Sequence, residues 1–558
     1  MKLTGSQIII ECLLEQGVDT VFGYPGGAVL NIYDALYRYS GRIRHIITAH
    51  EQGAAHAADG YARSTGKTGV VIATSGPGAT NLVTGIATAY MDSIPVIAIT
   101  GNVSCNLLGL DSFQEVDITG ITMPITKHNY IVKDVTKLAD VIREAFMIAN
   151  TGRKGPVLID IPKDITAAET EFIPAVSEKE HPLNDSFTVE EIAEAVQLIE
   201  DSKRPMIYAG GGVISSGAAK ELAEFAEISD APVSCSLMGL GGFDTCNFRY
   251  TGMLGMHGSV TSSKTITECD LFIGIGTRFS DRVICDIQSF APNAKIMQIE
   301  IDPAEINKNI AVDYALVGDV KRVLKALCEV LPKQHHTSWM NRIAGWKTEH
   351  PLRQISPSGG VTPEQVIKTL CRLTNRDAII TTEVGQHQMW AAQFYEFRRP
   401  RQFCSSGGLG TMGYGLGAAI GAQLANPDKR VINIAGDGSF HMNCNELVTA
   451  YKFNVPVVEL LFNNNVLGMV RQWQRLFYEG RFSQTTLDRN TDYRKLAEAY
   501  HVRYLRIETP KEVESVLKEA LNGEGPVLVE CIIDQDINVL PMVPAGASIN
   551  KPILEIKV

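Results

Sequence analysis

The segment RVINIAGDGSF, residues 430–440, decides the fold class of this 558-residue chain. Its apolar run RVINIAG is typical of a strand buried in a parallel sheet. Gly436-Asp437-Gly438 follows the strand, and a helix is expected to start near Asn445. Asp437 is therefore predicted to lie at the carboxyl edge of the sheet, where ligands of open α/β sheets bind.

A second polar turn follows the next strand along the chain. The segment VPVVELLFN (455–463) leads into three asparagines at 463–465, and 24 residues separate Gly438 from Asn463. This spacing fits one helix plus one strand, which places the two turns side by side. Glycine amides can approach a phosphate there, and Mg²⁺ takes oxygen ligands that it shares with phosphates. We predict Mg²⁺ ligands at Asp437, Asn464 and the carbonyl of Val466, although each motif taken alone could be a tight turn or a strand cap.

Alternating strands and helices predict three consecutive parallel-sheet α/β domains. The first domain (1–172) has expected strands at 70–74, 95–100 and 156–161, the second (189–331) at 205–210, 232–236, 271–276 and 296–302, and the third (363–558) at 378–384, 430–436, 455–463 and 526–533. Segments 173–188 and 332–363 break the pattern and are expected to link the domains. The proline-rich tail from Asp536 is expected to wrap a surface or an active-site mouth.

The composition of the chain restricts its partners and its location. Its 51 Lys and Arg against 62 Asp and Glu give a formal net charge of −11, which argues against nucleic acid as the main partner. An anionic small substrate would need a few local cations. The N-terminal stretch is predicted to be an amphipathic helix and the uncharged run 402–427 a buried loop and helix, so we expect no membrane segment. Eleven cysteines without a Cys-x-x-Cys pair favour free thiols and a cytoplasmic location.

Motifs spread along the chain resemble those of a known family. The block GDGSFHMNCNELVTAYKFNVPVVELLFNNN (436–465) resembles the thiamine diphosphate motif of the pyruvate decarboxylase superfamily. Other motifs resemble acetohydroxyacid synthase catalytic subunits, namely FGYPGGAVL (22–30), HEQGAAHAADGYAR (50–63), TSGPGATN (74–81), FQEVD (113–117), GPVLIDIPKD (155–164), SSGGLGTMGYG (405–415) and PMVPAGAS (541–548). The resemblance covers essentially the whole chain and implies pyrimidine-binding, FAD-binding and diphosphate-binding domains, in that order.

The resemblance implies thiamine diphosphate as a cofactor and assigns its contacts. Glu51 matches the glutamate that hydrogen-bonds the cofactor pyrimidine and promotes loss of the thiazolium C2 proton; in isolation it would be an ordinary carboxylate at a helix start. Met412 matches the side chain that supports the bent cofactor, whereas most methionines fill cores. The other implied contacts, besides Asp437 and Asn464, are Pro77, Asn81, Val384, Gly385, Gln386, His387, Gly410, Gly436, Gly438, Ser439 and Met469.

FAD is the second implied cofactor. The segments MLGMHGS (253–259), GTRFSDRV (276–283) and EIDPAEI (300–306) resemble flavin-contacting segments of the family. The glycines at 210–212 alone form an incomplete dinucleotide fingerprint, and Ser280 stands where the family usually has an aspartate. The implied FAD contacts are Arg153, Gly210, Gly211, Gly212, Met256, His257, Gly258, Gly276, Arg278, Glu300, Asp302 and Asp319.

Two residues are expected to bind the second 2-keto acid. Arg282 is assigned to its carboxylate, which a guanidinium can hold with two hydrogen bonds; the alternative is a surface salt bridge with Asp281 or Asp286. Trp473 matches the family position that favours 2-ketobutyrate over pyruvate, and the alternative is a buried core tryptophan. The resemblance adds Phe113 to the substrate pocket and Gly27, Gln114 and Lys163 to the catalytic residues.

The implied reaction is that of acetolactate synthase. Pyruvate is decarboxylated on thiamine diphosphate and the hydroxyethyl carbanion adds to pyruvate or 2-ketobutyrate, the first common step of valine, leucine and isoleucine biosynthesis. A catabolic, flavin-independent acetolactate synthase and a pyruvate oxidase-like flavoenzyme are alternatives. Glyoxylate carboligases lack the glutamate, and a non-catalytic homologue is expected to have lost Glu51 or Asp437. The resemblance also implies a homodimer or homotetramer, with each active centre built from two chains, and a small regulatory subunit.

Overall fold

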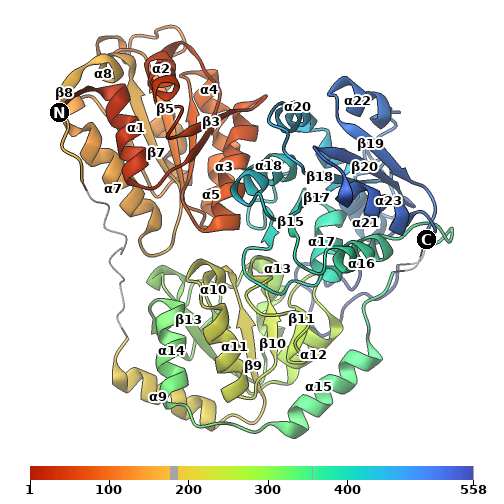
Figure 1. The fold of residues 1–558 in the computed structure, drawn as a ribbon. Helices are drawn as coiled ribbons and strands as arrows, with labels where there is room; N and C mark the ends of the chain where they lie inside the picture. The colour runs from red at the N-terminus through yellow and green to blue at the C-terminus, as the bar shows by residue number, and fades with distance from the viewer. Residues whose placement is uncertain (176–186, 355, 557–558) are drawn as a thin grey trace.

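Three α/β units make up the computed structural model, which describes residues 1–175, 187–354 and 356–556. The N-terminal and C-terminal units lie side by side, and the central unit packs beneath them (Figure 1). Each unit contains one six-stranded sheet whose paired strands are all parallel. The predicted fold class is confirmed. Most of the expected linker 173–188 lies outside the described residues.

The N-terminal unit is built on a sheet of order β3-β2-β4-β5-β7-β6. Its strands are β2 (Thr20–Gly23), β3 (Arg44–Ile47), β4 (Gly69–Ala73), β5 (Val96–Asn102), β6 (His128–Ile131) and β7 (Val157–Pro162). Its helices are α1 (Gly5–Glu15), α2 (Leu30–Arg38), α3 (Glu51–Thr65), α4 (Pro77–Thr80), α5 (Val83–Met91), α6 (Ile118–Thr122), α7 (Leu138–Asn150) and α8 (Lys163–Ala167). The short strands β1 (Lys2–Thr4) and β8 (Glu169–Glu171) pair antiparallel beside this sheet. The expected amphipathic first helix is α1.

The central unit is built on a sheet of order β11-β10-β9-β12-β13-β14. Its strands are β9 (Pro205–Ala209), β10 (Val233–Cys235), β11 (Tyr250–Met253), β12 (Leu271–Ile275), β13 (Lys295–Glu300) and β14 (Tyr314–Val317). Its helices are α9 (Val189–Glu200), α10 (Gly211–Ser215), α11 (Ala219–Ile228), α12 (Val260–Glu268), α13 (Asp281–Ile284) and α14 (Val320–Val330).

The segment after the central sheet differs from its prediction. Residues 332–363 were expected to be irregular, but they contain the 13-residue helix α15 (Thr337–Glu349). Trp339, Ile343 and Trp346 are buried on one face of this helix, at spacings of four and three residues. The indole Nε1 of Trp339 donates to the carbonyl of Pro205 at 3.0 Å. The helix therefore packs against the central unit.

The C-terminal unit is built on a sheet of order β16-β15-β17-β18-β20-β19. Its strands are β15 (Ile379–Thr382), β16 (Phe403–Cys404), β17 (Val431–Gly436), β18 (Val458–Asn463), β19 (Arg503–Ile507) and β20 (Val527–Ile532). Its helices are α16 (Pro363–Leu373), α17 (Gln386–Phe394), α18 (Gly415–Ala425), α19 (Asp437–Phe440), α20 (Leu447–Lys452), α21 (Gly468–Phe477), α22 (Tyr493–Ala499) and α23 (Val513–Asn522). A helix does start near Asn445, as expected, with a 3-10 turn at Cys444–Glu446 that leads into α20, but the short helix α19, which begins directly at Asp437, was not expected.

The N-terminal and C-terminal units meet through two helices rich in small residues, α3 and α18 (Figure 1). A Cβ atom added at Gly60 of α3 would overlap the carbonyl oxygen of Ala418, and one added at Gly421 of α18 would overlap that of Ala57. The two backbones therefore approach each other at a distance that only glycine permits at these positions.

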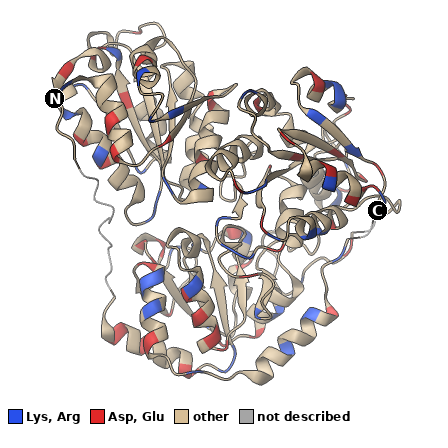
Figure 2. Ribbon diagram, viewed as in Figure 1, with Lys and Arg blue, Asp and Glu red and all other residues tan. Residues whose placement is uncertain are grey.

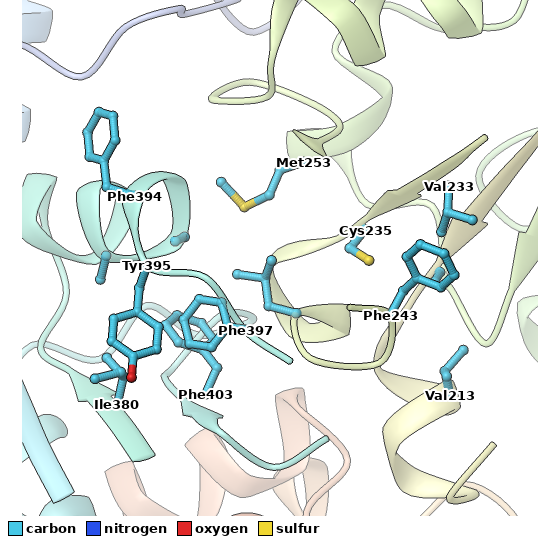
Figure 3. Close-up of a cluster of buried hydrophobic side chains, with 14 of the residues drawn as sticks. Val213, Val233, Cys235, Phe243, Met253, Ile380, Phe394, Tyr395, Phe397 and Phe403 are labelled. Atoms are coloured by element: carbon cyan, nitrogen blue, oxygen red, sulfur yellow. The ribbon is translucent and has the colours of Figure 1, made fainter. Parts of the chain in front are cut away.

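The central and C-terminal units share an apolar core. Phe243 and Met253 of the central unit belong to the same cluster of buried apolar side chains as Phe397 and Phe403 of the C-terminal unit (Figure 3). The tail after Asp536 also joins them: Val543 N–H donates to the carbonyl of Met256 at 2.8 Å, and Gly546 N–H to that of Cys285 at 3.0 Å. The expectation that the tail wraps a surface is confirmed.

The distribution of charged residues and the state of the cysteines agree with the expectations drawn from the composition. Acidic and basic residues are interspersed over all three units (Figure 2). No helix among the described residues has the length and apolar character needed to cross a membrane. All eleven cysteines lie in described parts of the chain and are free thiols.

Candidate active site

The two polar turns of the C-terminal sheet lie next to each other, as predicted. Strands β17 and β18 pair in parallel with Gly436 opposite Phe462. As a result, Asp437 and Asn463–Asn465 line one pocket of about 300 Å³. Burial raises the pKa of the Asp437 carboxyl to about 7, and the backbone N–H groups of Gly438 and Asn465 oppose this rise. A buried carboxyl beside amide oxygens is a donor set that suits Mg²⁺.

Of the other two predicted metal ligands, Asn464 lines this pocket and Val466 does not. The side-chain oxygen of Asn464, which lines the pocket, accepts a hydrogen bond from Val466 N–H at 3.2 Å. Val466 forms an antiparallel bridge with Thr486 and is not a lining residue of this pocket. Ligation by the Val466 carbonyl thus stays a prediction. Several lining residues were missed, among them His441, which lies inside the 436–465 block, and Arg489 and Tyr493, which lie outside every motif.

His387 lies beside the Gly436 turn. A Cβ atom added at Gly436 would lie 2.6 Å from Nδ1 of the imidazole. Burial lowers the pKa of His387 to about 3, so the ring is neutral at pH 7. Its buried Nε2 has no hydrogen-bond partner among the described residues. An orphaned polar atom at this turn fits a polar ligand group.

Glu51 is the first residue of α3, and the TSGPGATN turn lies next to it. Asn81 Nδ2 donates to Glu51 Oε2 at 2.9 Å. A Cβ atom added at Gly78 would lie 3.3 Å from Glu51 Oε1, so the turn packs closely against the carboxylate. Glu51 is half-buried and lines neither of the two cavities described here.

The other expected residues of the N-terminal unit gather at the carboxyl end of its sheet. Thr74 follows β4, accepts a hydrogen bond from Ala28 N–H beside Gly27, and lies against Gly78. The Gly76 turn is in close contact with the backbone of Gln114. Lys163 begins α8 and is exposed, and Phe113 is 87% exposed. Large exposed apolar side chains accompany them, namely Tyr24, Leu107, Leu110, Ile121 and Met123.

A cavity of about 1320 Å³ is lined by residues of all three units. It brings together most residues expected to contact FAD, namely Arg153, Gly210, Gly211, Gly212, Met256, His257, Gly258, Gly276, Arg278, Glu300 and Asp319. Asp302 is not a lining residue but lies 3.7 Å from the Arg153 guanidinium. The Met469 and Gly410 residues expected at thiamine diphosphate also line this cavity.

The lining of this cavity suits a dinucleotide. A Cβ atom at Gly210 would overlap the carbonyl oxygen of Gly276, so backbone alone forms this wall. Arg278 has no carboxylate partner within the described part of the chain, and His257 Nδ1 is buried without a hydrogen-bond partner there. A free guanidinium beside bare backbone is the arrangement that binds a diphosphate group.

Arg282 and Trp473 meet at the same cavity. The guanidinium carbon of Arg282 lies 5.7 Å from the centre of the Trp473 ring. The alternative ion pair with Asp281 also exists, but it is exposed and long, at 3.8 Å. Trp473 is half-buried, and its indole N–H is buried without a partner among the described residues. It is therefore not a core tryptophan.

Three family descriptions match the chain in the order of its units. They are the N-terminal TPP binding domain (3–121), the central domain (192–327) and the C-terminal TPP binding domain (383–531) of thiamine pyrophosphate enzymes. The chain is 46% identical to the acetolactate synthase isozyme 2 large subunit of Escherichia coli, over 99% of this chain and 100% of that protein. It is 47% identical to the probable acetolactate synthase large subunit of Methanocaldococcus jannaschii, over 100% and 96% of the two chains. The chain belongs to the acetolactate synthase large-subunit family.

This family membership confirms the resemblance on which the sequence predictions rest. A third acetolactate synthase large subunit, from Haemophilus influenzae, is 43% identical over 99% of this chain and 98% of its own length. The matches extend across all three units. They favour acetolactate synthase over a pyruvate oxidase as the identity of the enzyme.

Proposed function

We propose that this chain is the catalytic subunit of an acetolactate synthase, which decarboxylates pyruvate and joins the two-carbon product to pyruvate or 2-ketobutyrate. The observation that carries the proposal is the meeting of Arg282 and Trp473 at one cavity. A guanidinium binds the carboxylate of a 2-keto acid, and the adjacent ring contacts its alkyl group. A decarboxylating enzyme without an acceptor needs no such pair.

Thiamine diphosphate and Mg²⁺ are the cofactors proposed for the C-terminal unit. The chemistry that thiamine diphosphate supplies when bound is a site that holds the electron pair left behind when CO₂ departs. Asp437, Asn464 and the Val466 carbonyl would hold Mg²⁺, and glycine amides with His387 would hold the diphosphate. The orphaned Nε2 of His387 and the buried carboxyl of Asp437 support this assignment.

Glu51 is proposed to exchange a proton with the cofactor pyrimidine. Because Glu51 lines neither cavity of its own chain, a second chain is proposed to bring its Asp437 turn to this carboxylate. The exposed apolar side chains around Phe113 support a partner surface there. A homodimer is the smallest assembly that completes two sites.

FAD is proposed to fill the large cavity, held by the Gly210–Gly212 backbone and by Arg278. Ser280 would replace one acidic contact of the family without removing the site. A small regulatory subunit is also proposed, since the relatives are named as large subunits.

The experiment that tests the activity is incubation of the chain with pyruvate, thiamine diphosphate, Mg²⁺ and FAD. Acid treatment converts acetolactate to acetoin, which is then measured together with acetate and peroxide. Acetoin as the main product is expected. Acetate and peroxide in its place would identify a pyruvate oxidase, and full activity without a bound yellow chromophore would point to the flavin-independent enzyme.

A further inference from the structure

Glu383 is a buried carboxylate to which no sequence motif assigns a role. It follows β15 and precedes the 384–387 turn, with 1% of its surface exposed. Its backbone N–H donates to the carbonyl of Ile434 in the neighbouring strand β17 at 3.0 Å. This hydrogen bond holds Glu383 at the carboxyl end of the sheet, next to the turn that follows β17.

One oxygen of Glu383 joins two of these turns. Oε2 accepts hydrogen bonds from Gly413 N–H at 2.6 Å and from the Ser439 hydroxyl at 2.7 Å. Gly413 directly follows Met412, and Ser439 lies two residues after Asp437. This oxygen therefore links the turn that carries the expected cofactor support to the turn that carries the expected metal ligand.

The other oxygen anchors the helix that follows. Oε1 accepts from Gly415 N–H at 2.9 Å and from Leu416 N–H at 3.2 Å, at the start of α18. On the backbone side, the imidazole of His387 hydrogen-bonds to the main chain of Glu383. The segments 384–387, 412–416 and 437–439 thus converge on this one residue.

The number of donors explains why the residue is a carboxylate. The ionised form accepts at both oxygens without carrying a proton of its own, so it satisfies all four donors. Burial raises the pKa of Glu383 to about 7, and the donors oppose this rise. A glutamine would place its NH₂ group against one pair of donors. Each pair includes a backbone N–H, which cannot rotate, so at least one buried donor would lose its acceptor.

We propose that Glu383 is a positioning residue of the acetolactate synthase reaction. It fixes the Met412 turn relative to the Asp437 turn, so that the support of the cofactor and the ligand of its metal ion keep one spacing. The inference rests on the proposed function for what these turns bind. The contacts of the carboxylate do not depend on it.

Glu459 of β18 offers a matched control in the same core. It is fully buried, and Asn433 Nδ2 donates to both of its oxygens at 2.9 Å. Burial raises its pKa well above the usual range, which favours the protonated form, and glutamine is a close replacement for that form. Its hydrogen bonds are to Asn433 and not to the cofactor turns.

The test compares Glu383→Gln, Glu459→Gln and the wild-type full-length chain. Calorimetry measures the Kd of thiamine diphosphate at saturating Mg²⁺, and steady-state assays then give kcat and KM for pyruvate at saturating cofactor. Glu383→Gln is expected to raise the cofactor Kd at least about tenfold and to lower kcat, while KM for pyruvate changes less than about twofold. Glu459→Gln is expected to keep the wild-type Kd.

Two results would overturn the proposal. One is wild-type cofactor affinity and turnover in Glu383→Gln, and the other is an equal loss in both variants, which would reflect only a disturbed core. Should Glu383→Gln fail to fold, Glu383→Asp keeps the charge but draws the carboxylate away from its four donors and is expected to raise the Kd about threefold, whereas an unchanged Kd contradicts the linkage. A wild-type chain that binds thiamine diphosphate but makes no acetolactate refutes the proposed function alone.

Discussion

Glu51 and Asn81 form the contact on which the proposed chemistry depends most. Asn81 orients one carboxylate oxygen at 2.9 Å, which leaves the other oxygen for a ligand. Glu51→Gln keeps this shape but removes the proton that the carboxyl exchanges. We expect acetolactate formation to fall about 100-fold or more, as for the loss of a general acid–base group, with little change in the Kd of thiamine diphosphate. Product assays and calorimetry measure both quantities.

The control for this prediction is Glu169→Gln, which alters an exposed carboxylate of the same unit that pairs with Lys2. It is expected to retain wild-type turnover. A near-normal rate in Glu51→Gln would exclude Glu51 from the catalytic role.

The buried carboxyl of Glu459 is expected to make the free energy of unfolding depend on pH. Burial raises the pKa of Glu459 in the folded chain well above 4.5, whereas the unfolded chain releases the proton above this ordinary value. Because the folded state binds the extra proton, this group lowers the free energy of unfolding as the pH rises above 4.5, by up to roughly 1.4 kcal/mol per pH unit. In Glu459→Gln this group no longer titrates, so its contribution to the fall in the free energy of unfolding disappears.

Urea denaturation of the cofactor-free protein checks this prediction. Glu459→Gln is expected to unfold at a higher urea concentration than the wild type at pH 8, and at a similar one near pH 5. A variant that is destabilised equally at both pH values would show that the Glu459 proton has no such effect.

At the scale of elements, the strands predicted from sequence are interior strands of the three sheets. The edge strands β3, β6, β11, β14, β16 and β19 and the interior strand β2 were not predicted. An edge strand has one neighbour and stays partly exposed, so its sequence mixes polar with apolar residues, as in HNYI of β6 and RYLRI of β19. Such short mixed runs lack the apolar signal of VINIAG in β17.

Helix α15 was missed for another reason. Its apolar residues Trp339, Ile343 and Trp346 have helical spacing, but the proline before the segment and the prolines and glycines after it favour a loop. The helical spacing of these three residues was the signal that could have identified it.

The close contact of α3 and α18 predicts the effect of adding one methyl group. Gly421→Ala places a Cβ atom against the carbonyl oxygen of Ala57, and backbone cannot move aside as a side chain can. We expect a loss of about 2 kcal/mol in stability, typical of overpacking, which thermal melting would show as a lower Tm.

The matched control is Gly345→Ala in α15, where nothing lies within 4 Å of the added Cβ. This variant is expected to melt at or above the wild-type temperature, since alanine favours a helix interior by up to about 1 kcal/mol over glycine. Identical melting of the two variants would contradict the packing argument.

At the scale of the whole molecule, the proposed active centre is divided between two chains. Glu51→Gln and Asp437→Asn subunits are each expected to be inactive alone. When they are co-expressed, half of the dimers are mixed, and each mixed dimer regains one intact centre, so about a quarter of wild-type activity is expected for a two-fold symmetric dimer. Acetoin assays on the purified mixture measure this recovery. Its absence would place Glu51 and Asp437 in the same chain's centre.

Local sequence was sufficient to determine the pocket between the ends of two neighbouring strands, β17 and β18. The adjacency of Asp437 and Asn464 follows from their spacing, because parallel strands joined by one helix end at the same edge of a sheet. The apolar runs likewise determined the interior strands other than β2 and the three-unit order.

Tertiary packing alone decided the contacts between distant segments. Arg282 lies over Trp473 because the central and C-terminal units share one apolar core, and three turns converge on Glu383 because their strands and helices pack together. No residue near Glu383 in sequence signals its four donors, since they come from segments that only the folded sheet brings within hydrogen-bond distance.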